Sequence, residues 1–152
     1  IALLTNKEVQ PYLILAEKLG KAMVQLSPEQ TSELEFEYAG DCTKYADVLT
    51  DGILKGIISE YVDDSINLIN ARVYADERGF KIKEVTSNKT KTFSDLITIR
   101  MPKNEEYKSI SATLFGDGDY RVVDIDGYGL EMRLEGDLLL YQNEDKPGML
   151  AW

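Results

Sequence analysis

The sequence predicts an α+β fold, in which helices pack on a mainly antiparallel sheet. Up to about residue 78, apolar residues recur at helical spacing, whereas from Phe80 onward apolar and polar residues alternate as they do in strands. The later half also contains Asp117-Gly118 and Asp126-Gly127, two pairs that favour tight hairpin turns because both residues support positive φ. Helices followed by hairpin-linked strands are typical of α+β domains.

The first and third of three expected helices are amphipathic segments. The first covers Pro11 to Leu26, and Ser27-Pro28 ends it. The third covers Leu68 to Arg78 and ends at Gly79, a residue suited to a helix C-terminus.

The second expected helix begins with a choice of caps. Either Asp41 or Thr43 can cap it, and its apolar stripe runs to about Tyr61. Gly52 and Gly56 lie four residues apart on this helix, so another element can approach it closely. We interpret both glycines as packing residues.

One strand is expected before the second helix and six after the third. From Glu33 to Tyr38, glutamates alternate with apolar residues, which predicts a strand with one solvated face. That alternation explains the row of glutamates better than a calcium site does, because no Asp/Asn/Gly loop pattern accompanies it. The later strands are expected at 81–86, 94–101, 107–115, 119–125, 128–134 and 137–142.

Composition excludes several classes of function. The 152 residues suffice for one domain, and with 27 acids against 17 bases we expect neither nucleic acid nor membrane as a partner. Cys42 is the only cysteine, which fits a cytoplasmic protein, and its neighbours predict an inert thiol. With no histidine, no G-x-G-x-x-G and no Walker loop, the chain is expected to hold no catalytic site, metal or cofactor of its own.

The two ends of the sequence suggest a piece of a longer protein. Residue 1 is Ile and not Met. Separately, the longest apolar run is far shorter than the ~20 residues needed to span a bilayer, so we expect no membrane span. Leu138 to Tyr141 predicts a buried strand, and Pro147 suits the first turn of a following helix. That helix would be cut short at Trp152.

Several motifs in order resemble the C-terminal half of long-form bacterial D-3-phosphoglycerate dehydrogenases. The segments that carry the resemblance are residues 11–20, 67–71 with 77–79, 114–116, 121–128 and 143–148. The resemblance implies the intervening, allosteric substrate-binding domain of that family. It places residues 1–26 in a helix leaving an upstream catalytic part, 27–136 in the intervening domain, and 137–152 in the first strand and turn of an ACT domain.

The resemblance also implies a function and partners. The parent would be an NAD-dependent enzyme of L-serine biosynthesis, and this domain would bind a small anion and couple to the serine-binding ACT domain. Its partners would be the flanking domains and further copies of the chain in a homo-oligomer. Two alternatives stay open: the accessory domain of an iron–sulfur L-serine dehydratase, or a dimerisation domain without a ligand.

Arg121 and Arg133 match the positions where this family can carry basic residues for an allosteric phosphate or phosphorylated substrate. Guanidinium groups suit phosphate because they bind it bidentately and stay charged. With an unbulged turn at Asp126-Gly127, however, Arg121 would face Met132 and Arg133 would point to the other side of the sheet. A bulge or a longer loop is needed to bring the two together. Otherwise each is a solvated strand residue that pairs with a nearby carboxylate, Asp124, Glu131 or Glu135.

Asn143 and Asp145 match the ACT turn that contacts the serine effector in this family. Some members carry histidine and asparagine at these two positions, so we expect the residues to act here as turn and cap residues. Lys103, Lys108 and Arg100 are possible extra anion contacts, although a solvated strand face also explains them. Asn67 and Asn70 are expected to cap or brace the third helix through local backbone bonds.

Overall fold

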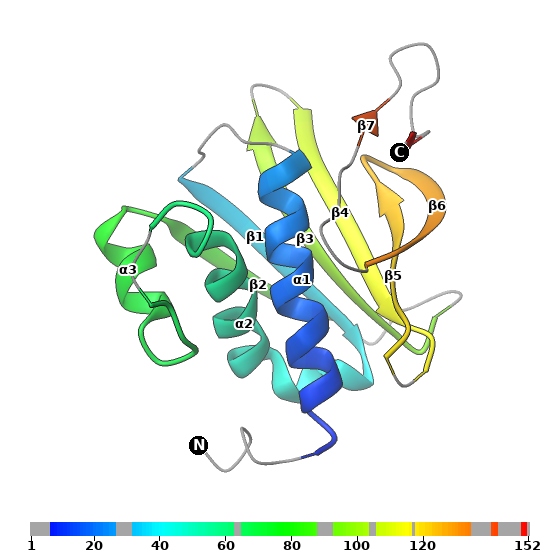
Figure 1. Cartoon of the computed structure of the whole chain (residues 1–152), viewed down its shortest axis with the longest axis horizontal. Helices are drawn as coiled ribbons and strands as arrows, with labels where there is room; N and C mark the ends of the chain where they lie inside the picture. The colour runs from blue at the N-terminus through cyan, green and yellow to red at the C-terminus, as the bar shows by residue number, and fades with distance from the viewer. Residues whose placement is uncertain are drawn as a thin grey trace.

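The computed structural model describes residues 7–26, 32–62, 65–87, 93–103, 106–116, 118–134, 141–142 and 150–151 (Figure 1). The helical elements are α1 (Gln10–Leu26), the 3-10 helix η2 (Asp41–Tyr45), α2 (Ala46–Ile58) and α3 (Ala71–Glu77). The strands are β1 (Glu33–Gly40), β2 (Lys81–Ser87), β3 (Asp95–Lys103), β4 (Glu106–Leu114), β5 (Tyr120–Ile125), β6 (Tyr128–Arg133), β7 (Tyr141–Gln142) and β8 (Leu150–Ala151). The α+β prediction is confirmed.

Six strands form one sheet in the order β2-β1-β3-β4-β5-β6. All neighbours are antiparallel except β1 and β2, which run parallel. A parallel pair needs a crossover, and α2 with α3 supplies it between the two strands. The sequence pattern predicted the strands but not this pairing, because alternation shows a strand without showing its neighbour.

The helices α1 and α2 lie side by side across one face of the sheet (Figure 1). Their contact is close because of glycine: a Cβ added to Gly20 or Gly56 would overlap a backbone carbonyl of the other helix, at Ile53 or Glu17. The prediction that Gly56 permits close approach is confirmed. A Cβ at Gly52 would meet the side chains of Ala16 and Leu13 at 3.3 and 3.4 Å, which is tight but without overlap, and the carbonyl oxygen of Leu13 at 3.6 Å.

The second helix begins differently from the prediction. Residues 41–45 form a 3-10 turn, and the hydroxyl of Thr43 donates to the carbonyl of Gly40 (3.0 Å) instead of accepting from a helix N–H. The buried carboxylate of Asp95, on β3, accepts from the N–H of Cys42 (2.6 Å) and from the hydroxyl of Tyr12 (2.7 Å). The side-chain bond to the 3-10 turn therefore comes from a residue 53 positions away in sequence, and no side chain caps the start of α2 itself.

The third helix is shorter than predicted, because its first turn is replaced by a loop of side-chain bonds. Asn67 Oδ1 accepts from the N–H groups of Ile69 and Asn70, and Asn70 Oδ1 accepts from the N–H of Asn67. The prediction of local backbone bonding by both asparagines is confirmed. Arg72 then ties α3 to α2 through Asp51 (Nε–Oδ1, 2.6 Å).

The helix expected after Pro147 is wrong at residues 150–151. Leu150 pairs with Gln142 and Ala151 with Tyr141, which makes β7 and β8 a short antiparallel ladder. A helix of only a few residues cannot repay its nucleation cost, whereas cross-strand pairing satisfies the same backbone groups. Residues 143–149 lie outside the described part of the chain. Among the helices that the structure places, none is both long and apolar enough to cross a bilayer.

Candidate anion site

Arg121 and Arg133 lie directly opposite each other on β5 and β6. Ile125 pairs with Tyr128 across the two-residue turn, but the register shifts between Val122 and Asp124, so that Arg121 meets Arg133. The side chain of Asp124 braces the turn by accepting from the N–H of Gly127 (2.9 Å). The bulge required by the sequence argument is therefore present, and it places both guanidinium groups on one face.

Arg121 is held by two carboxylates and an aromatic ring. Its Nε and one terminal nitrogen donate to Asp119 (2.9 and 3.0 Å), and the other terminal nitrogen donates to Glu131 (3.1 Å). Its guanidinium carbon lies 4.7 Å from the ring centre of Phe115. Hydrogen bonds from Arg121 lower the pKa of Asp119, and the same bonds raise the pKa of Arg121.

Arg133 is the more open of the two arginines. Its side chain is 59% exposed, against 24% for Arg121, and its Nε lies 3.8 Å from Asp119. Asp119 is therefore shared between both guanidinium groups.

Two guanidinium groups beside one carboxylate supply the hydrogen-bond donors that oxyanions require. Guanidinium forks bind carboxylate and phosphate with the same planar geometry, and phosphate offers more oxygens and charge. Arg133 and Glu131 are exposed and Arg121 and Asp119 are half-buried, so water screens the ion pairs among them in part.

The sequence prediction included pairing with Glu131 but not Asp119 or Phe115. The contact with Asp119 could have been predicted from its spacing to Arg121. Residues i and i+2 along an extended chain share a face, so the two side chains lie next to each other. Phe115 has no such signal, because it reaches Arg121 across the β4–β5 turn.

The other cations named from the sequence lie elsewhere. Arg100 donates to Glu35 and Glu37 of β1 (2.9 and 2.8 Å), so it neutralises the acidic row on that strand. Lys108 pairs with Asp126 (3.3 Å), and Lys103 ends β3. Within the described residues, no three His, Cys, Asp or Glu side chains are arranged for a metal ion.

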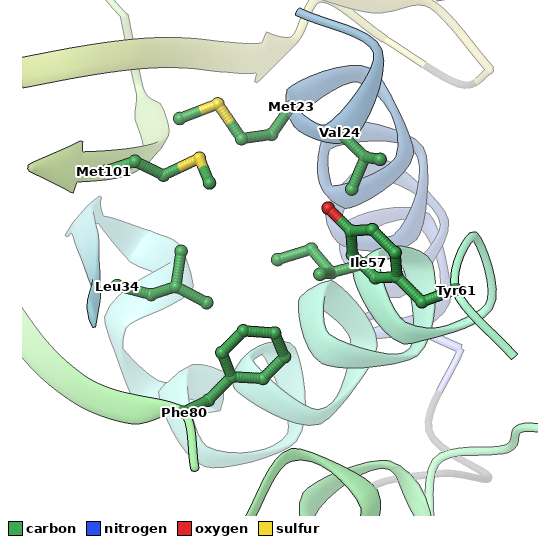
Figure 2. Close-up of a pocket in the computed structure, with 7 residues that line it drawn as sticks. All are labelled: Met23, Val24, Leu34, Ile57, Tyr61, Phe80 and Met101. Atoms are coloured by element: carbon green, nitrogen blue, oxygen red, sulfur yellow. The ribbon is translucent and has the colours of Figure 1, made fainter. Parts of the chain in front are cut away.

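Two hollows lie on the helical side of the structure. Figure 2 shows the smaller, of about 10 Å³, which has room for about one water and is walled by apolar side chains apart from the Tyr61 hydroxyl. The larger, of about 380 Å³, lies where α1 begins. Its charged lining balances Lys7 and Lys44 against Glu8 and Asp41, so it offers an anion no net attraction. The lining of the smaller hollow is Met23, Val24, Leu34, Ile57, Tyr61, Phe80 and Met101.

Residues 8–126 match the family described as the D-3-phosphoglycerate dehydrogenase intervening domain. The chain belongs to this family. Three similar proteins are D-3-phosphoglycerate dehydrogenases. That of Archaeoglobus fulgidus is 31% identical over 94% of the chain and 27% of its own length. That of Bacillus subtilis is 25% identical over 95% of the chain and 28% of its own length. That of Methanocaldococcus jannaschii is 27% identical over 95% of the chain and 27% of its own length.

The chain thus spans about a quarter of the length of the relatives it matches. The effector candidates Asn143 and Asp145 lie outside the described residues, so only the arginine pair can be placed on the domain. Val122 and Met132, their strand neighbours, are buried in the core that includes α1 and α2, so the arginine pair lies on the other face of the sheet. No helix in the described part of the chain covers that face (Figure 1).

Proposed function

We propose that this chain is a regulatory and assembly domain of an NAD-dependent D-3-phosphoglycerate dehydrogenase of cytoplasmic L-serine biosynthesis. By its resemblance, the parent enzyme oxidises 3-phosphoglycerate to 3-phosphohydroxypyruvate. NAD and the catalytic groups belong to the parent's other domains, since this sequence has no histidine and no dinucleotide-binding glycine motif. The domain itself binds phosphate or a phosphorylated substrate at Arg121 and Arg133.

The observation that carries the proposal is the pairing of two arginines on one face in a chain of net charge −10. Placing like charges opposite each other on adjacent strands is unfavourable unless an anion lies between them. Asp119 supplies that anion internally. An external oxyanion that takes its place leaves Asp119, in the segment between β4 and β5, without its partner.

Release of Asp119 links ligand binding to the rest of the parent protein. The β5–β6 hairpin leads through residues 135–140 to β7, and we assign residues 137–152 to the start of the ACT domain, with residues 27–136 as the intervening domain and 1–26 as the helix from the catalytic part. Asn143 and Asp145 are the proposed effector contacts. A change in the hairpin therefore reaches the ACT domain over a short stretch of chain.

Isothermal titration calorimetry of the 152-residue chain with inorganic phosphate and with phosphohydroxypyruvate tests the anion site. We expect saturable binding that is lost in Arg121→Ala and Arg133→Ala. Arg100→Ala is the matched control, because it removes an arginine from the same sheet face that is also held by two carboxylates. Asp119→Asn is expected to bind phosphate more tightly, because it removes the competing charge.

Absence of binding, or equal loss in Arg100→Ala, would contradict the anion site and favour a dimerisation domain without a ligand. The relatives reported above are all dehydrogenases, which favours the dehydrogenase over the iron–sulfur serine dehydratase.

A further inference from the structure

We propose that Phe115 positions Arg121 for the oxyanion, because its aromatic ring holds the guanidinium group in place when the carboxylate of Asp119 leaves. This role rests on the proposed function, since it adds a residue to the same anion site. Phe115 acts through Arg121 and makes no contact with the oxyanion, so it is a positioning residue.

The guanidinium group of Arg121 lies over the ring of Phe115, directly after β4. The guanidinium carbon is 4.7 Å from the ring centre, inside the ~6 Å within which the face of an aromatic ring attracts a cation. All three nitrogens of Arg121 donate to carboxylates while this contact is present. The ring therefore leaves the donors of Arg121 open to an anion.

The ring of Phe115 is itself fixed by contacts that do not involve the Asp119 carboxylate. The ring of Phe93 stands perpendicular to it (90°), with 5.8 Å between ring centres, an edge-to-face arrangement that aromatic quadrupoles favour. In the turn, the N–H of Phe115 donates to the carbonyl of Asp119 (2.9 Å), and the N–H of Asp119 donates to the carbonyl of Gly116 (3.1 Å). The ring can thus stay in place when the Asp119 side chain turns away.

Without the ring, little would hold Arg121 once Asp119 has left. Asp119 accepts from two of the three nitrogens of Arg121. Glu131 accepts from the third at 3.1 Å, and its side chain is 60% exposed, so water screens that pair. A released arginine regains rotamer freedom, and an anion must remove that freedom again when it binds. The ring lowers this cost, because its attraction does not depend on Asp119.

Core packing does not account for a phenylalanine at this position. Phe115 is 44% exposed and is not part of the core that includes α1 and α2. The side chain of Arg121, in contrast, is only 24% exposed. The ring therefore covers a charged group and contributes little to the core, which is the arrangement expected of a residue that orients a cation.

Calorimetric titration of the chain with inorganic phosphate tests the role of the ring. Phe115→Leu keeps an apolar side chain but removes the aromatic face, so it should weaken phosphate binding about two- to fivefold. Phe115→Tyr keeps the face and should bind as the parent chain does. Tyr128→Leu is the matched control, because Tyr128 is an aromatic residue of similar exposure (48%) at the other end of β6 from Arg133, and it should leave the affinity unchanged.

A spectroscopic signature separates positioning from a merely structural role in the turn. The ring current of Phe115 shifts the guanidinium proton signals of Arg121. In nitrogen-15 NMR, the Nε–H proton signal of Arg121 should therefore move in Phe115→Leu and stay in place in Phe115→Tyr. The same difference should persist at saturating phosphate, because the ring contact remains after Asp119 has left.

Circular dichroism of each variant establishes that it is folded. Equal affinity of Phe115→Leu and the parent chain, or equal losses in Phe115→Leu and Phe115→Tyr, would overturn this role alone, because binding by the parent upholds the anion site. A loss in Tyr128→Leu as large as that in Phe115→Leu would also overturn it. A parent chain that binds no phosphate would overturn the anion site and the role of Phe115 together.

Discussion

Replacing Gly56 by alanine should disrupt the contact between α1 and α2. The added Cβ would overlap the backbone carbonyl of Glu17, and it would lie 3.1 Å from the amide nitrogen of Lys21. Backbone atoms cannot rotate out of the way, so the helices must move apart. Overpacking of this kind costs about 3 kcal/mol, at the upper end of the usual range.

Part of that cost is offset, because alanine favours a helix interior over glycine by about 1 kcal/mol. The expected net loss in the free energy of unfolding is therefore about 2 kcal/mol. Gly52→Ala is the matched control in the same helix. It gains the same propensity, and its nearest neighbours are the side chains of Ala16 and Leu13, with the backbone carbonyl of Leu13 farther away at 3.6 Å, so its net change should be about zero.

Urea denaturation of the three proteins measures both changes. At about 2–4 °C per kcal/mol for a chain of this size, Gly56→Ala should also melt about 4–8 °C below the parent. The difference in the free energy of unfolding between Gly56→Ala and Gly52→Ala is the packing effect alone, because both variants gain the same helix propensity. Equal stability of Gly56→Ala and Gly52→Ala would refute the close helix contact.

Three further predictions concern single side chains. Tyr38 donates to Thr50 (2.6 Å), and Thr50 donates to Glu84 (2.8 Å). Thr50→Val should therefore lower the free energy of unfolding, measured by urea denaturation, by about 2 kcal/mol, and Tyr38→Phe should lower it less. The reverse order would contradict the network. Burial raises the pKa of Cys42 from 9.0 to about 12, so the thiol ionises first in the unfolded chain. The free energy of unfolding should therefore fall as pH rises through that interval, and this fall should be smaller in Cys42→Ala. Arg121 lowers the pKa of Asp119, so this carboxylate stabilises the fold at neutral pH and loses its effect as pH falls through the lowered pKa. Carbon-13 NMR should show Asp119 titrating at higher pH in Arg121→Ala, and an unchanged midpoint would contradict the pairing.

The elements could be predicted from the sequence because their periodicities are local. The alternation of β1 and the helical spacing of α1 each depend on a few neighbouring residues. The start of α2 could not be predicted in this way. The 3-10 turn that precedes it is held by the carboxylate of Asp95, which only the folded sheet brings to Cys42.

The candidate site shows the same division. Sequence resemblance singled out Arg121 and Arg133, and strand geometry showed that a bulge was needed to unite them. That bulge lies on β6, where Leu130 and Glu131 together oppose Val123, whereas Val123 is itself the extra residue against β4. The position of the bulge depends on the register between strands, and no local pattern specifies it. The role of Asp119 follows from its spacing to Arg121 once the strand is placed.

The central claim is that Arg121 and Arg133 bind an oxyanion together in place of Asp119. The direct measurement is a phosphate titration of the chain followed through the arginine Nε–H signals in nitrogen-15 NMR. The account predicts that the signals of Arg121 and Arg133 shift together and saturate at one common midpoint, while that of Arg100 stays in place. Shifts of similar size at all three arginines, or none at Arg121 and Arg133, would contradict it.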